Sequence, residues 1–590
     1  MLSLSVSHGV VMLLPPAEGD SAAHKEALAH LRENAFEKAR AVAKKILEEN
    51  KDDMRARLLV ALGWLGEGKD KECWHTLELA RAQDPRGSAA LYGTVGEVFA
   101  TNRRLYRAIH CLETSLSLAD DRARSLRLAD LYMSQARFAE AARVYEKHAN
   151  ATPARLQLAR IALLQHHYAA AVDHATQALA GDQAPAIATF VLASALLCQD
   201  NLAAADDAFV RCLEAGVAPA QVAYSRALIA LLSGDHSAAA AHFAKAAPDA
   251  VSTQIGQAVL AQVRGDLPEA LRHATHALRH NPQEPLCNFI LANIYSDQGD
   301  FEKAPLAYRA AAPLCADFAL SHFSPKSLAE TTSKAGWGRL SLMALCFREG
   351  YYSRTINLAG SEPAAKAGHP LYAAWQARAL AALEKHEAAR TLLEKAATRF
   401  PEWSLPVQLL AEVAASTGSH AQAAGHYRTL LEQQPNASHI TLRLAEQLFL
   451  ANQIDEALQA YSKAASLNPS DGLALNQKAW ILSEKKGDHE KALKFALEST
   501  AANPNQPGPR DTLAWIYYRL GQTEKSLEIY QPLLDQPVTD PAMTYRLGCA
   551  LQKQGETTRA AVRFEAALNK SATFDGAEDA VRRLREIAGW

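Results

Sequence analysis

Apolar residues recur at helical spacing along most of the chain, in pairs of segments joined by a short polar turn. Each segment has one apolar and one polar face, which is typical of an amphipathic helix packed against neighbours. The turn carries Gly or Asn, which can end a helix because they adopt the left-handed backbone conformation at low cost. The pattern therefore predicts a succession of helical hairpins.

The turn has a recurring sequence. GDFEKA, from Gly299 to Ala304, has near-copies such as GDLPEA, GSHAQA, NQIDEA, GDHEKA, GQTEKS and GETTRA. The small last residue, here called the anchor, recurs sixteen times, at Ala39, Cys73, Ala108, Ala141, Ala171, Ala205, Ala239, Ala270, Ala304, Thr355, Ala389, Ala423, Ala457, Ala492, Ser526 and Ala560. Most steps are 34 residues, a few are 30 to 35, and one is 51. Such a fixed period indicates a repeat array.

Other positions keep the same phase. An apolar-small pair precedes the anchor, as in Leu444-Ala445, a bulky residue follows it by four positions, and proline often follows by twelve. With its 34-residue period, this pattern resembles the tetratricopeptide-repeat family over almost the whole chain. The resemblance implies an all-α fold, a right-handed superhelical α-solenoid of about sixteen stacked hairpins. Its stability would be roughly a sum over neighbouring hairpins.

The long step divides the predicted array. We expect an N-terminal array of about nine repeats at 22–315, an irregular insertion or joint at 316–337, and a C-terminal array of about seven repeats at 338–572. A longer loop or extra helix within an unbroken solenoid is the alternative for 316–337. Residues 573–590 carry Ala580, Val581, Leu584 and Ile587 on one side. They are predicted to form a capping helix, because a solenoid must cover its last apolar face.

Charge and cysteine usage narrow the class of protein. Lys and Arg number 62 and Asp and Glu 64, a formal charge of −2, so no global basic excess favours nucleic acid. The eight cysteines form no CxxC pair, and we expect them to be core residues rather than disulfides or zinc ligands. The sequence contains no run of 18 apolar residues, so it predicts no membrane span. Residues 1–21 are interpreted as disordered or weakly signal-like, since their apolar start lacks a basic residue.

No catalytic constellation stands out. The sequence has no GxxxxGK[ST] loop, no GxSxG elbow and no HExxH motif. His166-His167 form a pair, but their spacing supplies no converging metal ligands. We therefore expect a non-enzymatic protein without cofactor or metal. Nearly every residue from 22 onward is accounted for by repeats, which leaves little room for an attached enzyme domain.

The resemblance to tetratricopeptide arrays implies that the first helix of each repeat lines a concave groove, and that this groove binds other proteins or peptides. The residue after the apolar-small pair should face that groove. The candidate partner-binding residues are Asp130, Asn293, Arg378, Glu412, Glu446, Trp515 and Tyr517. For Trp515 and Tyr517, aromatic hot spots and core packing are both open. The predicted function is a protein–protein interaction scaffold or adaptor of unknown partner and oligomeric state.

A narrower resemblance concerns the end of the chain. The last two repeats and the tail, about 80 residues, look like the ends of bacterial tetratricopeptide proteins encoded with exopolysaccharide and exosortase systems. This implies an alternative function as an accessory of envelope exopolysaccharide synthesis or secretion. We expect a cytoplasmic protein, with a periplasmic or membrane-associated location as the alternative. Members of that group often carry an N-terminal lipoprotein cysteine, whereas the first cysteine here is Cys73.

Overall fold

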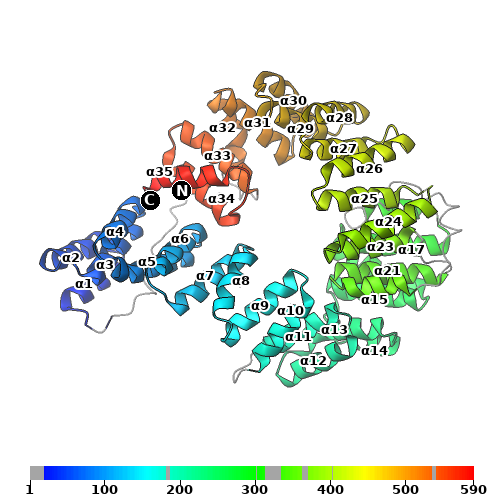
Figure 1. The fold of residues 1–590 in the computed structure, drawn as a ribbon, viewed down its shortest axis with the longest axis horizontal. Helices are drawn as coiled ribbons and strands as arrows, with labels where there is room; N and C mark the ends of the chain where they lie inside the picture. Colours follow the sequence, from blue (N-terminus) through cyan, green and yellow to red (C-terminus); the bar gives the residue numbers. More distant parts are fainter. Residues whose placement is uncertain are drawn as a thin grey trace. The chain divides into compact units, whose positions relative to one another are not determined.

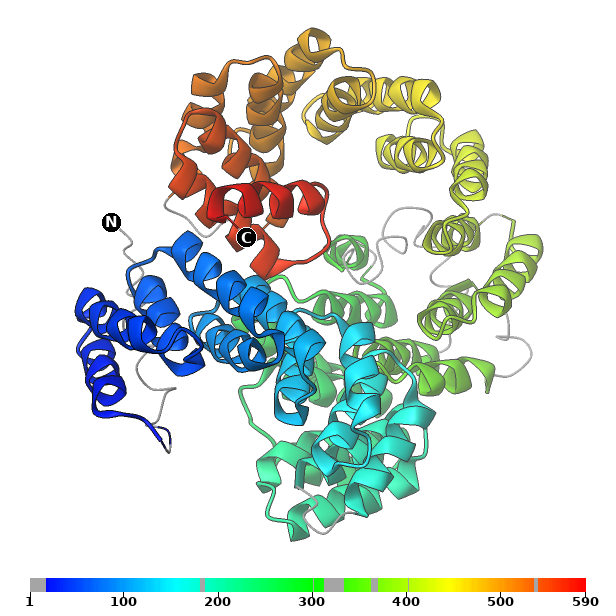
Figure 2. The same cartoon turned by 60° about the vertical axis from the view of Figure 1, so that its left-hand side comes forward.

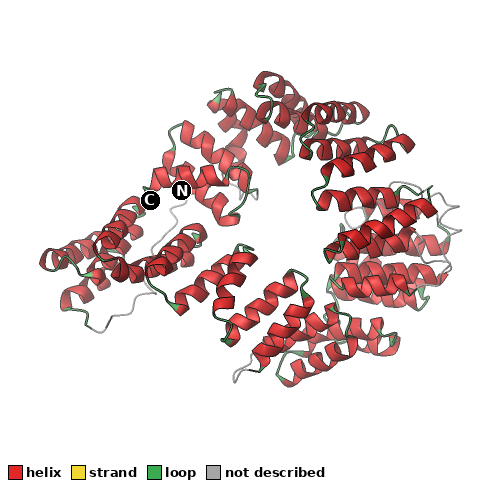
Figure 3. Ribbon diagram, in the orientation of Figure 1, coloured by secondary structure: helices red, strands yellow, loops and turns green. Residues whose placement is uncertain are grey.

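The computed structural model describes residue 17 and residues 19–180, 186–300, 302–311, 334–361, 370–401, 403–534 and 540–589. These residues form 33 helices and no strand (Figure 3). Eighteen helices precede the gap at 312–333 and fifteen follow it, which corresponds to nine hairpins, seven hairpins and one final helix. The predicted all-α hairpin stack and its repeat number are confirmed.

The chain forms two compact units, and the first combines both ends of the sequence, residues 1–149 and 475–590. Its helices, labelled in Figure 1, are α1 (Ala22–Arg32), α2 (Phe36–Glu49), α3 (Met54–Gly66), α4 (Asp70–Gln83), α5 (Pro85–Thr101), α6 (Leu105–Leu118), α7 (Arg122–Ser134), α8 (Phe138–Lys147), α29 (Leu473–Glu484, apart from its first two residues), α30 (His489–Ala502), α31 (Pro507–Arg519), α32 (Thr523–Leu534), α33 (Pro541–Lys553), α34 (Thr557–Lys570) and α35 (Ala577–Ala588).

The second unit comprises residues 150–474. Its helices are α9 (Thr152–Leu164), α10 (Tyr168–Leu179), α11 (Ala186–Cys198), α12 (Leu202–Glu214), α13 (Pro219–Leu232), α14 (His236–Phe243), α15 (Val251–Val263), α16 (Leu267–His280), α17 (Pro285–Gln298), α18 (Lys303–Ala310), α21 (Lys334–Arg348), α22 (Tyr352–Gly360), α23 (Pro370–Ala382), α24 (His386–Arg399), α25 (Leu405–Ser416), α26 (His420–Gln433), α27 (Ser438–Leu450) and α28 (Ile454–Leu467).

The recurring turn ends one helix and starts the next. Gly299 at the end of α17 has φ 75°, in the left-handed region, and Asn452 between α27 and α28 has φ 61°. Asp266 begins α16, where its carboxylate accepts a hydrogen bond from the backbone N–H of Glu269. This cap satisfies a donor that has no partner within the helix. The polar turn seen in the sequence thus builds the tip of each hairpin.

The anchors explain why the two helices of a hairpin pack closely. All sixteen, including Thr355 and Ser526, have 0% exposed surface. The bulky residue four positions later is buried as well, as for Tyr461 and Phe564. A small side chain admits the first helix, and the ring beside it fills the remaining space; full burial of such a ring contributes about 1.5–3 kcal/mol. The assignment of these positions to the core is confirmed.

The final helix, α35, packs against α34 and α33. Ala580 and Leu584 are fully buried, Val581 and Ile587 are partly buried against the same apolar cluster, and Arg582 lies in solvent between Asp579 and Glu586. One face therefore covers the last hairpin and the other faces water. The predicted capping helix is confirmed.

Within the first unit, hairpins from the two ends of the sequence meet. Helix α6 contacts α34, and α4 and α6 lie near α34 and α35 in both views (Figure 1, Figure 2). The Arg104 guanidinium binds Glu565 at 2.7 and 2.9 Å and Asp70 at 2.6 and 3.1 Å. Arg107, almost fully buried, pairs with the same two carboxylates. The backbone N–H of Tyr106 donates to Asn569 Oδ1 at 2.9 Å.

Within the second unit, the chain departs from nearest-neighbour stacking. Helix α21 packs on α15 and α17, and α22 contacts α11. Tyr168 OH donates to the carbonyl of Gly350 at 2.9 Å, and Tyr224 OH donates to Glu349 at 3.0 Å. Asn357 donates to Asp200 at 2.7 Å. These contacts join residues 125 to 182 positions apart, so helices α21 and α22 lie on helices that precede them by several repeats.

Two sequence predictions, the N-terminal segment 1–21 and the joint 316–337, fall mainly outside the described residues. The structure does not describe residues 1–16 of the first or residues 316–333 of the second. A single buried apolar cluster includes residues from Ala193 to Leu410, on both sides of that segment. The division into two arrays stays a prediction. None of the helices within the described ranges is both long and apolar enough to cross a bilayer.

Candidate partner-binding groove

Three predicted groove residues form a row in the second unit. Arg378, Glu412 and Glu446 occupy the same position of successive repeats, on α23, α25 and α27, and each is partly exposed. The Arg378 guanidinium lies 5.7 Å from the ring centre of Trp375, which packs in the core beneath it. The row arises because a 34-residue repeat returns the same helix face to the same side of the stack.

Charges alternate along this row. Arg443, one turn before Glu446 on α27, binds the Glu446 carboxylate at 2.9 Å. Burial lowers the pKa of Arg443, but the carboxylates of Glu446 and Glu412 outweigh burial and raise the pKa above its usual value. The order from α23 to α27 is therefore Arg378, Glu412, Arg443, Glu446. Such a row suits a partner segment that carries both signs of charge.

A pocket opens at the start of the row. It has a volume of about 310 Å³ and is lined by Phe347, Ala377, Arg378, Ala381, Leu409, Glu412, Val413 and Ser416. Its walls are apolar, with one cation and one anion beside them. An apolar side chain could fill it while neighbouring polar groups meet Arg378 and Glu412. The sequence analysis missed Phe347, Leu409 and Val413. Leu409 lies three residues before Glu412 and four before Val413, and both spacings place side chains on a shared helix face.

The predicted groove residue Asn293 is not accessible. It is fully buried, donates to Ser341 Oγ of α21 at 2.8 Å and accepts from Tyr308 OH at 2.7 Å. The expectation that its side chain is available to a partner is wrong. The physical reason is the packing of α21 on α17, which places part of the chain itself over this position.

The same packing covers neighbouring repeats. The Arg348 guanidinium lies 3.4 Å from Glu284, and the ring of Tyr352 meets His166 edge-on at 5.1 Å. Burial raises the pKa of the Glu349 carboxyl, and burial together with the Glu349 charge raises that of Tyr224. The contact of residues 348–352 with the preceding repeats is therefore largely shielded from water. The faces of α13 and α17 that would receive a partner are occupied by α21 and its following turn.

The remaining predicted residues lie in the first unit. Asp130 on α7 is exposed and accepts a 2.5 Å hydrogen bond from Tyr145 OH. Tyr517 is partly buried, with the Lys525 ammonium 5.4 Å from its ring centre. Trp515 is 9% exposed and stacks on Tyr518 at 4.8 Å within the terminal core, so its placement in the groove is corrected to core packing.

Nucleophilic chemistry has little support among the described cysteines. Seven are free and buried, as expected from the sequence. Burial raises the thiol pKa to about 12 for Cys198 and Cys287 and to about 11 for Cys549. A thiol with so high a pKa carries almost no thiolate at neutral pH, and the thiolate is the reactive form.

Comparisons with known proteins agree with the repeat. Two tetratricopeptide-repeat family models match, one at residues 255–317, 376–438, 409–472 and 442–507 and the other at 125–159. No curated protein matches the chain.

Three solved structures match over most of the chain. The anaphase-promoting complex assembly Cut9–Hcn1 shares 14% identity over 95% of both chains with a TM-score of 0.33. Naa15/Naa10 bound to HypK shares 16% over 96% of this chain and 79% of that chain, with a TM-score of 0.31. Yeast Tom70 shares 14% over 80% and 96%, with a TM-score of 0.32.

The family assignment rests on agreement between independent features. The 34-residue period, sixteen buried anchors, the hairpin stack with its final helix and the matching family models all describe the same repeat unit. The chain therefore contains tetratricopeptide repeats, which the family models match at residues 125–159, 255–317 and 376–507.

Proposed function

We propose that the protein is a non-catalytic interaction scaffold that binds a segment of a partner protein along α23, α25 and α27. The observation that carries this proposal is the row of Arg378, Glu412 and Glu446 beside the 310 Å³ apolar pocket. In protein interfaces, most binding energy comes from a few side chains buried in desolvated pockets and surrounded by polar contacts. An extended segment or a helix of the partner would place one apolar side chain in the pocket.

Site-specific photo-crosslinking tests the location directly. A benzophenone amino acid at Ser416, an exposed residue at the pocket, should crosslink to the partner in cells. The same probe at Thr398, exposed on the second helix α24, is the matched control. A partner that is captured from Thr398 as efficiently as from Ser416 would place the binding surface elsewhere.

Charge reversal measures the contribution of the row. Arg378→Glu should weaken binding of the captured partner by about 30-fold or more, the loss that corresponds to a hot-spot residue of about 2 kcal/mol. Arg390→Glu is the control, because Arg390 is an exposed α24 arginine that pairs with Glu387 and Glu394. Unchanged affinity in Arg378→Glu, with the fold intact by circular dichroism, would contradict the proposed groove.

The envelope-polysaccharide function is the second candidate. Its support is the resemblance of the last two repeats and the tail, whose α33, α34 and α35 form one packed group. Cell fractionation distinguishes the two candidates. Recovery in the envelope fraction, together with loss of surface polysaccharide on deletion of the gene, would favour this alternative, whereas a purely cytosolic protein would count against it.

A further inference from the structure

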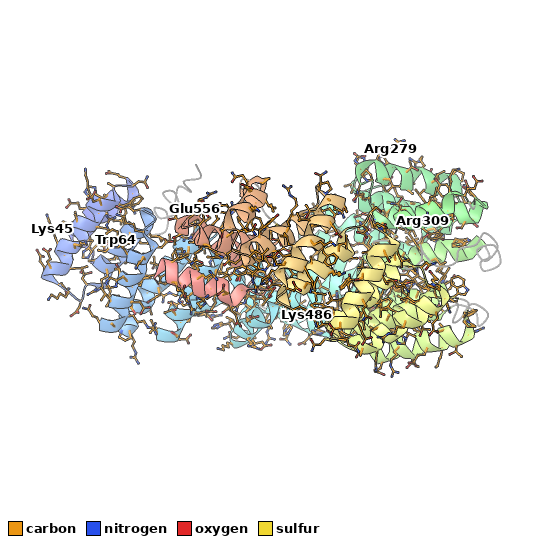
Figure 4. The ribbon with its side chains drawn as sticks, turned by 90° about the horizontal axis from the view of Figure 1, so that it is seen from above. Lys45, Trp64, Arg279, Arg309, Lys486 and Glu556 are labelled. Atoms are coloured by element: carbon orange, nitrogen blue, oxygen red, sulfur yellow. The ribbon has the colours of Figure 1, made fainter. Side chains whose placement is uncertain are left out.

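A cluster of metal-ligating side chains lies at the base of the hairpin formed by α15 and α16. It consists of Asp249, in the loop before α15, and His276 and His280, in the last turns of α16. One ligand atom from each residue lies within 4.8 Å of the others. Arg279, labelled in Figure 4, marks this end of α16. The sequence analysis expected no metal site; Asp249 is 27 residues before His276, and only the hairpin brings them together.

The two histidines are four residues apart on one helix, so their rings lie on the same face, with centroids 5.1 Å apart. This is the spacing by which a helix presents two imidazoles to zinc. Ligand atoms about 2.0–2.1 Å from a tetrahedral Zn²⁺ are about 3.3 Å from one another. The three ligand atoms lie within 4.8 Å of one another, so they must move closer together to bind the ion.

A buried network holds the loop that carries Asp249. The Gln254 amide donates to the carbonyl of Pro248 at 2.6 Å, and its oxygen lies 2.7 Å from His273 Nδ1. Burial and the Arg272 charge lower the pKa of His273, which favours the neutral ring. Since the Gln254 oxygen can only accept, His273 Nδ1–H donates to it. Helix α16 is thereby linked through α15 to the residue next to Asp249.

The donor set selects among metals. Two imidazole nitrogens and one carboxylate favour divalent transition ions such as Zn²⁺, whereas Ca²⁺ and Mg²⁺ prefer sites made of oxygen ligands. Three protein ligands leave a fourth zinc position for water or for a group from a partner. The carboxylate supplies the negative charge that offsets the cation, and Arg279 and Arg272 on α16 oppose it. The balance favours a site of moderate rather than extreme affinity.

We propose that Asp249, His276 and His280 bind one Zn²⁺ ion, which joins the start of α15 to the end of α16. The bound ion closes the base of this hairpin, opposite its turn. Because Asp249 and His280 are exposed, the fourth position faces solvent and is accessible to an incoming ligand.

The proposal is tested by isothermal titration of untagged, chelator-treated full-length protein with ZnCl₂. We expect one saturable site in the micromolar range or tighter. His276→Ala and His280→Ala should each weaken it by more than the roughly 10- to 100-fold typical for loss of an outer-sphere group. Alanine has the best helix propensity, so both variants should keep α16. Titrations with CaCl₂ and MgCl₂ should show no binding at this site.

His75→Ala is the matched control, because His75 is an exposed helical histidine on α4, outside the cluster. It should bind zinc like the wild type. The absence of saturable zinc binding in the wild type, or binding that His276→Ala and His280→Ala leave unchanged, would overturn the proposal. So would Ca²⁺ binding in preference to Zn²⁺.

A second measurement separates ligation from non-specific binding. Hydrogen exchange should show zinc-dependent protection at the start of α15 and the end of α16, and His280→Ala should abolish it. Zinc that binds without altering exchange at either place is bound elsewhere, and the assignment is then wrong.

Discussion

Replacement of Glu565 by glutamine tests the contact between the two ends of the chain. Glu565 on α34 accepts from Arg104 at 2.7 and 2.9 Å and lies 3.1 Å from Arg107 Nε. Both arginines also bind Asp70, so two cations share two carboxylates in a largely buried cluster. Glutamine keeps the shape of the side chain and removes its charge. Two guanidinium groups would then share one carboxylate.

The size of the effect follows from burial. Removing one partner of a buried ion pair typically costs about 3–5 kcal/mol, because a charge is left uncompensated. Here Arg107 is 2% and Arg104 21% exposed, and both keep Asp70. Water reaches Arg104 and the second carboxylate remains, so we expect a smaller loss of about 2–3 kcal/mol. This corresponds to about a 30- to 150-fold increase in the population that has opened this contact.

Hydrogen exchange followed by mass spectrometry is the appropriate assay, since repeat arrays open in parts rather than as one unit. Peptides that cover α6 and α34 should exchange about 30- to 150-fold faster in Glu565→Gln, provided that they exchange through this opening. The amide of Tyr106, which donates to Asn569, is the most direct probe. Glu456→Gln is the control, because Glu456 pairs with Arg428 on an exposed surface, where the expected cost is about 0–1 kcal/mol.

The reasoning is refuted if α6 and α34 exchange in Glu565→Gln at the wild-type rate while both proteins remain folded. That result would mean that the ion cluster does not hold the two ends together. Faster exchange throughout the chain, rather than at these helices, would also contradict a local contact.

Acid should open the same contact, because Arg107 and Arg104 outweigh burial and lower the pKa of Asp70. The stabilisation by Asp70 is present above its unfolded pKa of about 3.9 and is lost as the pH falls through the lower folded value, so hydrogen exchange should find α6 protected at pH 5 and exposed only in stronger acid. Gly548→Ala should destabilise by about 1–2 kcal/mol in urea unfolding, because its new Cβ would lie 2.7 Å from the buried Phe564 ring. Gly425→Ala, with no atom within 4 Å, should instead stabilise by about 0.5–1 kcal/mol. Cys549, whose thiol pKa burial raises to about 11, should resist iodoacetamide in the native protein and react in urea, as mass spectrometry would show.

Much of the fold could be predicted from the sequence because its information is local and repeated. The turn, the anchor and the bulky residue lie within one hairpin, and each copy reports the same geometry. All sixteen anchors are buried, even where Thr355 or Ser526 replaces alanine. The capping helix was equally predictable, since its amphipathic face has a single use at the end of a stack.

The candidate site was only partly predictable. The 34-residue register placed Arg378, Glu412 and Glu446 on one face, and the structure keeps them in a row. The same rule failed for Asn293. Its own repeat is regular, but α21 packs over it and buries the side chain. Trp515 failed for a different reason: an inward-facing aromatic ring can stack on Tyr518 within the core.

The sequence by itself therefore determined the hairpins, their number, their buried faces and the final cap. Only the tertiary structure decided which of the predicted groove residues are accessible, which distant helices meet, and that Asp249 lies near His276 and His280. The physical reason is the range of the interactions. Helix periodicity, turns and anchors act within about 34 residues, whereas packing between non-adjacent repeats depends on shape and charge complementarity between surfaces that no local pattern encodes.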